Sequence, residues 1–258
     1  AEALTTGESA SDTFSYTVSD GKLSETAEID FTVNGINDAP DLVDAIKTKK
    51  YTEGQSNVTI IDGSLTIRDV DDINIENASV SITDEFQTNE DTLAFTPNFG
   101  ITGSWSQATG VLSLTGSATK TNYESALQTV TYTNTNNPNP VIGLRTITWS
   151  INDGESTSSA ITSQVDVGGI NDSPESFNEA VALNAGSTVS TPSQSNLLAN
   201  DIDPESDTLV IHSFRAGAEQ TSNPDFAAGA TITALYGALT IEANGQYSYN
   251  AGQDAAQR

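Results

Sequence analysis

Apolar and polar residues alternate with a period of two along most of this chain. The alternating stretches are rich in Thr, Val, Ile and Tyr, and Gly, Asn, Asp or Pro separate them. Successive side chains of a strand point to opposite faces, so this pattern is typical of antiparallel strands with one solvated face. The clearest stretches are 14–18, 29–33, 80–82, 112–114, 146–151 and 239–241. The pattern therefore predicts an all-β protein.

Two local signals refine this prediction. Asn244-Gly245 lies between two alternating runs, 239–241 and 247–249, and both residue types tolerate a positive φ, which predicts a β-hairpin there. Residues 123–130 have helical spacing, with Tyr123, Leu127 and Val130 on one face, and predict a single short helix packed on a sandwich.

A six-residue phrase occurs twice in the chain. Gly35–Pro40 (GINDAP) returns as Gly169–Pro174 (GINDSP), and we call the separation of Gly35 from Gly169 the repeat offset. The stretch before it also repeats, since VSDG at 18–21 matches INDG at 151–154, one position short of the repeat offset. Solenoid units have about 20 to 50 residues, so a repeat of this much greater length is a whole domain. The chain is predicted to be part of a tandem array.

The repeated phrases divide the chain into residues 1–39, 40–172 and 173–258. Only the middle piece, 40–172, is predicted to be a complete repeat. The first piece has the strands that end a repeat, and the last piece has those that begin one, so together they amount to about one more repeat. Because the chain lacks Met and a signal peptide, we expect it to be an internal segment of a longer protein.

Composition excludes several partners and chemistries. Thirty-five acidic residues against nine basic ones give a formal net charge of −26, which repels nucleic acids and anionic membrane surfaces. We expect no nucleic-acid partner, and no membrane insertion, since no apolar run approaches the roughly 20 residues of a membrane span. Cysteine is absent, so disulfides cannot support the fold. Hydrophobic burial and bound metal ions therefore remain as possible sources of stability.

Several motifs resemble known repeat families. Residues 200–209, 236–241 and 245–249 resemble the front half of the VCBS-type repeat of large bacterial surface (RTX-type) adhesins, and residues 7–21 resemble its back half. The middle piece is similar to a cadherin-like repeat, on residues 51–54, 69–71, 110–116, 123–132 and 145–149. The resemblance implies tandem Ig/cadherin-like Greek-key β-sandwich domains joined end to end. It also implies a secreted bacterial protein at the extracellular cell surface, with calcium as its metal.

Both repeated phrases carry a candidate metal site. Calcium prefers six to eight oxygen ligands, and a linker Asn-Asp with a downstream Asp-x-Asp could supply several of them. The Asp-x-Asp lies at 69–71 for the first junction and at 201–203 for the second, at nearly equal separations from the linker. The alternative is that both motifs are ordinary turns. The candidate Ca2+ ligands are Asn37, Asp38, Asp69, Asp71, Asn171, Asp172, Asp201, Asp203 and Asp207.

The resemblance adds Glu53 to this set. It implies that a Glu from the lower end of one domain completes the site at the next junction, so Glu53 would serve Asn171 and Asp172. The last piece departs from the pattern, because Ala185-Gly186 stands where its Glu would be.

The residues argue against an enzyme. The single histidine, His212, lies in an alternating run at 209–214 and has no nucleophile motif beside it. Trp149 alternates with Ile147 and Ile151, which predicts a core position. Trp105, beside Gly103-Ser104, is less constrained and is a candidate for sugar stacking.

Three hypotheses follow. The leading one is a calcium-rigidified, non-catalytic extender or stalk segment of an extracellular adhesin or surface filament. In the second, the chain is a self-assembling filament subunit, and its N-terminal strands complete the C-terminal half-domain of the next chain. The third is a carbohydrate-binding module centred on Trp105. The expected partners are neighbouring repeats or identical chains head to tail, with a surface or glycan target bound through other domains.

Overall fold

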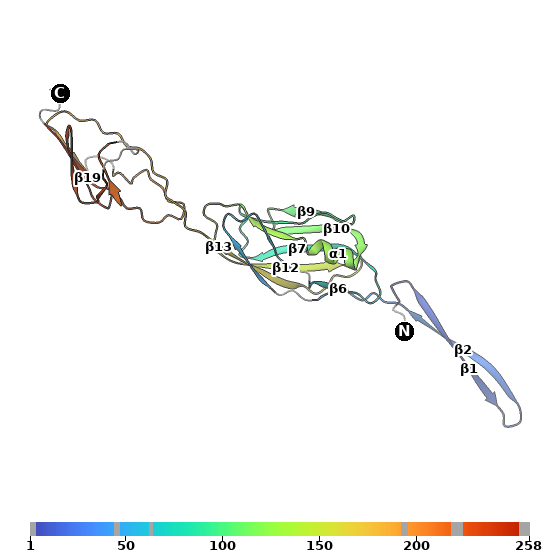
Figure 1. The fold of residues 1–258 in the computed structure, drawn as a ribbon. Helices are drawn as coiled ribbons and strands as arrows, with labels where there is room; N and C mark the ends of the chain where they lie inside the picture. The colour runs from blue at the N-terminus through green and yellow to red at the C-terminus, as the bar shows by residue number, and fades with distance from the viewer. Residues whose placement is uncertain (1–3, 44–46, 62–63, 192–195, 218–223, 253–258) are drawn as a thin grey trace. The chain divides into compact units, whose positions relative to one another are not determined.

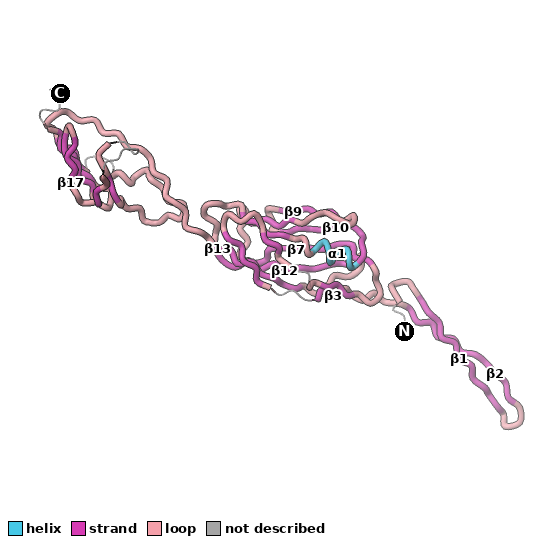
Figure 2. The backbone as a smooth tube through the Cα atoms, in the orientation of Figure 1, coloured by secondary structure: helices cyan, strands magenta, loops and turns pink. Residues whose placement is uncertain are grey.

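The structure is a computed structural model that describes residues 4–43, 47–61, 64–191, 196–217 and 224–252. The chain forms two compact units, Ala1–Ile170 and Asn171–Arg258, and each is described by itself. Strands and loops make up the described residues apart from one α-helix (Figure 2). The all-β class predicted from the alternation is confirmed.

The first unit begins with a two-stranded antiparallel hairpin, β1 (Ser9–Ser19) and β2 (Ser24–Asn34). Its turn is closed by Asp20, whose Oδ1 accepts the N–H groups of Lys22 and Leu23, both at 2.8 Å. These two hydrogen bonds lower the pKa of Asp20. Every residue of both strands is exposed, including the apolar ones. Among the described residues, no layer covers the apolar face of this hairpin.

The same unit contains a β-sandwich (Figure 1). Its larger sheet has six strands in the order β4-β13-β12-β7-β10-β9, and a smaller sheet has the order β5-β11-β8, with a further pair β3-β6. The bounds are β3 Asp41–Val43, β4 Thr48–Thr52, β5 Val58–Thr59, β6 Thr66–Arg68, β7 Asn74–Asp84, β8 Asp91–Ala94, β9 Thr102–Ser106, β10 Val111–Thr119, β11 Thr131–Asn134, β12 Gly143–Asn152 and β13 Ile161–Gly168. Most pairs are antiparallel, but β4 pairs with β13 in parallel.

Alternation along β12 builds the core of this sandwich. Ile147, Trp149 and Ile151 are buried while the residues between them are partly exposed. The core position predicted for Trp149 is confirmed, and its Nε1 donates to the hydroxyl of Ser163 at 2.9 Å. A period of two thus decides which side chains face the second layer.

The predicted helix is present but begins at Lys120 rather than at Tyr123. Helix α1 covers Lys120–Leu127, and the hydroxyl of Thr119 accepts the N–H of Asn122 at its N-terminus. It buries Tyr123, Ala126 and Leu127 against the sandwich. Val130, which helical spacing placed on the same face, is buried after the helix has ended.

The second unit has a four-stranded sheet in the order β14-β19-β18-β17 and a short pair, β15-β16. The bounds are β14 Thr188–Ser190, β15 Ser213–Phe214, β16 Phe226–Ala227, β17 Thr231–Ala234, β18 Gly237–Ile241 and β19 Tyr247–Ala251. The hairpin predicted at Asn244-Gly245 is confirmed, although only Gly245 has a positive φ, at +78°.

The strand expected around His212 is mostly wrong. Of residues 209–214, only Ser213 and Phe214 belong to a strand, and His212 is exposed. Local alternation does not make a strand unless a neighbouring strand supplies its hydrogen bonds.

Candidate metal centre

The first junction gathers carboxylates from two loops of the sandwich. One loop follows β6 and holds Asp69, Asp71 and Asp72, and the other joins β12 to β13 and holds Asp153. Asp69, Asp72 and Asp153 each offer a carboxylate oxygen, and these three atoms lie within 4.8 Å of one another. Calcium–oxygen distances are about 2.3–2.6 Å, so oxygens on opposite sides of one ion are about 5 Å apart. The spacing fits such an ion.

Each loop is held in place by its own hydrogen bonds. Oδ1 of Asp69 accepts the N–H groups of Asp71 at 3.2 Å and Asp72 at 2.9 Å, which closes a tight turn. The Lys120 ammonium group, at the start of α1, donates to the backbone carbonyls of Asp69 and Asp72. In the other loop, Oδ1 of Asp153 accepts two backbone N–H groups, from residues 155 and 156.

Two carboxylate oxygens of the first loop are left without a partner. Oδ2 of Asp69 and Oδ1 of Asp71 are buried and accept no hydrogen bond from any described residue. A buried polar atom without a partner is costly, and most such atoms in native proteins are satisfied. Carboxylate oxygens are the ligands that calcium prefers, and a bound cation can satisfy such an oxygen, so the donor set fits a divalent ion.

Electrostatic crowding in this cluster appears in the pKa values. Burial raises the pKa of Asp69, and the N–H groups of Asp72 and Asp71 offset this only in part. The pKa of Asp72 is also raised, first by burial and then by the charges of neighbouring acids that include Asp69 and Asp153. Burial alone would raise the pKa of Asp153, but hydrogen bonds led by the Ser156 N–H and the Asn37 amide lower it overall.

The linker residues join this cluster in a way that the motif did not predict. Asn37 Nδ2 donates to Oδ2 of Asp153 at 3.0 Å, and the backbone N–H of Asp38 donates to Oδ2 of Asp71 at 3.1 Å. The Asp38 side chain is exposed and is not among the three clustered carboxylates. The linker therefore contributes hydrogen-bond donors that hold the acidic loops.

A related arrangement occurs within the second unit. The Asp172 N–H donates to Oε2 of Glu205 at 3.3 Å, and Oδ1 of Asp203 accepts the N–H groups of Glu205 at 3.1 Å and Asp207 at 2.9 Å. Asn171 Nδ2 donates to the carbonyl of Asp172 at 2.9 Å. Asp201 instead accepts the N–H of Phe177 at 2.8 Å. Oε1 of Glu205 is buried and accepts no hydrogen bond from a described residue.

These contacts make different residues of the two acidic loops equivalent from those that the two Asp-x-Asp motifs would pair. Asp69 and Asp203 each accept the N–H two positions later, and Asp71 and Glu205 each accept the N–H of the linker Asp. Both pairs are separated by the repeat offset that relates Gly35 to Gly169. Glu205 is therefore the equivalent of Asp71, and Asp201 lies outside the equivalent set.

Glu53 lies just after β4 and is buried. Its Oε2 accepts the N–H of Ile170 at 2.8 Å, and Oε1 accepts no hydrogen bond from a described residue. A buried carboxylate oxygen without a hydrogen-bond partner is costly. The assignment of Glu53 to the second junction stays a prediction.

Three acidic residues of these clusters were not among the candidate ligands predicted from the sequence: Asp72, Asp153 and Glu205. Asp72 directly follows the Asp-x-Asp motif. Asp153 belongs to the repeated INDG phrase, which served only to establish the period. Applying the repeat offset to Asp71 would have found Glu205.

Other candidates lie away from these clusters. Trp105 packs edge-on against Phe86, with ring centroids 6.1 Å apart, and its Nε1 donates to Gln107. It is only partly exposed and packs against the core. In the described parts of the chain, no helix has the length and apolar character needed to cross a membrane.

Comparison with known proteins gives distant similarities. No family model matches the chain. Halomucin of Haloquadratum walsbyi (strain DSM 16790 / HBSQ001) is 36% identical over 123 residues, which is 46% of this chain and 1% of halomucin. The chain thus spans about one hundredth of the length of that relative.

Among solved structures, the cadherin-like domains 1 to 4 of zebrafish RET match 98% of this chain and 52% of theirs, at 11% identity and a TM-score of 0.27. The human Desmocollin-1 ectodomain matches 95% of this chain and 46% of its own, at 10% identity and a TM-score of 0.29.

Proposed function

We propose that this chain is a non-catalytic spacer segment of an extracellular surface protein, and that calcium stiffens its linkers. The observation that carries this proposal is the pair of buried oxygens on Asp69 and Asp71 that have no hydrogen-bond partner in the described parts of the chain. They belong to the loop whose Asp69 and Asp72 lie close to Asp153. Two loops that depend on the same ion would hold each other in place.

The linker is coupled to the ion through the same side chains. Asn37 and Asp38 donate to Asp153 and Asp71, so both acidic loops carry a hydrogen bond from the linker. Without a cation, carboxylates at 4 Å repel by about 1 kcal/mol per pair in water and about 4 kcal/mol at the effective dielectric of a protein surface. Calcium would supply the opposite charge and convert this repulsion into attraction.

The finer assignment extends this proposal. Adhesin repeats of the VCBS type and a secreted bacterial origin are proposed from the motifs alone, whereas a surface location also agrees with the match to a protein named halomucin. The adhesive target would then be bound by other domains. Glu53 and the acids of the second unit are proposed to serve the second junction in the same way.

Calcium-dependent stability tests the proposal. We expect calcium at about 100 times its dissociation constant to raise the free energy of unfolding by about 2.7 kcal/mol. Urea unfolding followed by tryptophan fluorescence measures this, because Trp105 and Trp149 both lie in the sandwich. Magnesium should stabilise less, since it demands a rigid octahedron of ligands.

Matched variants separate ion binding from a general charge effect. D69N/D72N removes two clustered carboxylates and should lose the calcium effect. D84N/E85Q removes the same charge from exposed residues of the same sandwich and should keep it. Equal unfolding curves for the native chain in chelator and in about 10 mM calcium, well above the dissociation constants of extracellular sites, would exclude the proposal.

A further inference from the structure

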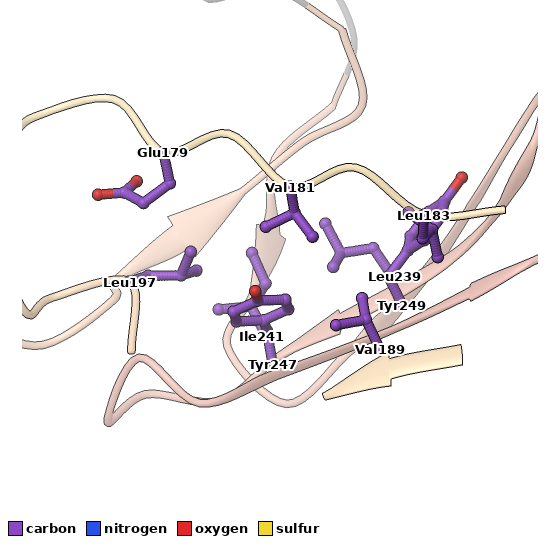
Figure 3. A pocket seen from close by; sticks show the side chains of 9 residues that line it. All are labelled: Glu179, Val181, Leu183, Val189, Leu197, Leu239, Ile241, Tyr247 and Tyr249. Atoms are coloured by element: carbon purple, nitrogen blue, oxygen red, sulfur yellow. The ribbon is translucent and has the colours of Figure 1, made fainter. Parts of the chain in front are cut away.

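The second unit has an open apolar groove of about 460 Å³. Val181 and Leu183 line it from a segment that belongs to no strand, and Val189, Leu239 and Tyr247 line it from the sheet. Figure 3 shows these side chains gathered between that segment and the sheet. Among the described residues, this unit buries only four apolar side chains, at positions 232, 241, 247 and 251. Its sheet therefore has an apolar face that is only partly covered.

The β1–β2 hairpin has an exposed apolar face that could cover such a groove. Phe14, Tyr16 and Val18 on β1 lie on the same face as Ile29, Phe31 and Val33 on β2, because the register places Phe14 opposite Ile29. The rings of Phe14 and Phe31 pack edge to face, with centroids 5.9 Å apart. These six side chains are nevertheless 46–59% exposed. Clustered exposed apolar groups of this kind mark an interaction surface.

The sandwich contains an equivalent hairpin in its completed state. Strands β12 and β13 precede the second GIND phrase as β1 and β2 precede the first. The offsets of the two repeated phrases relate Tyr16 to Trp149 and Phe31 to Val165. The pairing registers agree as well, since Tyr16 lies opposite Ala27 and Trp149 lies opposite Ile161.

Burial differs sharply between the two hairpins. Trp149 is 1% exposed and Val165 is 0% exposed, whereas their equivalents Tyr16 and Phe31 are 50% and 51% exposed. In the sandwich, both edges of this hairpin are paired, β12 with β7 and β13 in parallel with β4, and its apolar side chains belong to the buried core. The β1–β2 hairpin thus shares the offsets and register of the β12–β13 hairpin, but its apolar side chains are exposed.

We propose that the groove of the second unit receives the β1–β2 hairpin of a second copy of this chain. Strand β2 would pair in parallel with residues 182–186, the equivalent of β4 by the repeat offset. This segment belongs to no strand and contains Leu183. Phe14, Phe31 and their neighbours would enter the groove and complete its core. Repeated along copies, strand complementation makes a head-to-tail polymer.

Charge sets the conditions for this association. The chain carries a net charge of −26, and Glu179 lines the groove. Two copies therefore repel at low ionic strength. Roughly 1 M salt reduces the screening length to about 3 Å, so we expect association to strengthen with salt. No residue of the groove or the hairpin face is a proposed metal ligand, so chelator should not prevent it.

The test uses the full chain in sedimentation experiments at about 1 M salt, where charge is screened, with chelator. The native chain should form species that grow with concentration up to about 0.5 mM, where a millimolar or tighter interaction is detectable. F31D disables the hairpin face, and V181D disables the groove at a residue that is 41% exposed. Each variant alone should show a dissociation constant raised about 100-fold or more, because each buries a charge in an apolar contact.

Mixing the two variants gives the decisive result. F31D retains a groove and V181D retains a hairpin, so the mixture should form one-to-one dimers that do not grow further. The controls L23D, at the hairpin tip, and V210D, outside the groove, introduce the same charge at exposed residues and should associate like the native chain. A native chain that stays monomeric overturns the proposal, and so does association that survives in F31D or V181D. Monomers whose β1 and β2 amides resist exchange would mean that a chain fills its own groove, which also overturns it.

Discussion

The buried ion pair between Asp91 and Arg145 gives the sharpest test of how the sandwich is stabilised. Both side chains are fully buried, and Arg145 Nε donates to Oδ2 of Asp91 at 2.9 Å. Oδ1 of Asp91 accepts the hydroxyl of Tyr132 at 2.5 Å, and burial together with this carboxylate raises the pKa of Tyr132. Nη1 of Arg145, however, has no hydrogen-bond partner among the described residues.

These contacts set the expected magnitudes. Removing one member of a buried pair leaves an uncompensated charge, which typically costs about 3–5 kcal/mol. We therefore expect D91L and R145M each to lower the free energy of unfolding by about 3–5 kcal/mol. The double variant D91L/R145M replaces both charges by apolar groups, so neither charge is left buried alone. Little is lost at Arg145, because its Nη1 has no hydrogen-bond partner among the described residues. We expect the double variant to cost about 2 kcal/mol or less.

Urea unfolding with tryptophan fluorescence measures all four members of this cycle. Both tryptophans of the chain lie in the sandwich, so the signal does not report the second unit. The expected costs imply a coupling energy of several kcal/mol between positions 91 and 145. Costs that simply add, or an R145M cost below about 1 kcal/mol, would refute the view that desolvated charge dominates here.

Two further predictions concern the same sandwich. Burial would raise the pKa of Glu90, but hydrogen bonds from the Val141 N–H and the Asn136 and Asn134 amides, with the charge of Arg145, lower it overall. The ionised form is thus stabilised in the fold, so the advantage of the native chain over E90Q should be full at pH 7. This advantage should shrink as the pH falls below about 4.3, the pKa of Glu in the unfolded chain. Urea titrations at pH 7 and below about pH 4.3 check this. Gly116 has φ +130°, and an added Cβ would lie 2.7 Å from the carbonyl oxygen of Gly100. G116A should cost about 2–4 kcal/mol in the same assay and its neighbour control S117A much less, whereas equal costs would contradict the strain argument.

The acidic loops show what a local motif indicates and what it leaves out. The Asp-x-Asp motif pointed to Asp69 and Asp71, and each of them has a buried oxygen that finds no hydrogen-bond partner among the described residues. The motif did not indicate that Asp153, which is distant from Asp69 along the chain, lies beside it. That proximity depends on how the β12–β13 turn and the loop after β6 meet at one end of the sandwich. No local pattern encodes such a meeting.

Alternation was sufficient to predict the all-β class and many of its strands, although it failed at residues 209–212. Period two is a property of the extended backbone itself, so it predicted the strands around Phe14, Phe31 and Trp149 without knowledge of their neighbours. The same period could not distinguish Trp149, which is buried, from its equivalent Tyr16, which is exposed. Burial is a property of the layer opposite a strand, and that layer comes from distant parts of the chain or from another molecule. The residue pattern therefore specifies which face of each strand is apolar, whereas the packing of distant segments specifies which of those faces is covered.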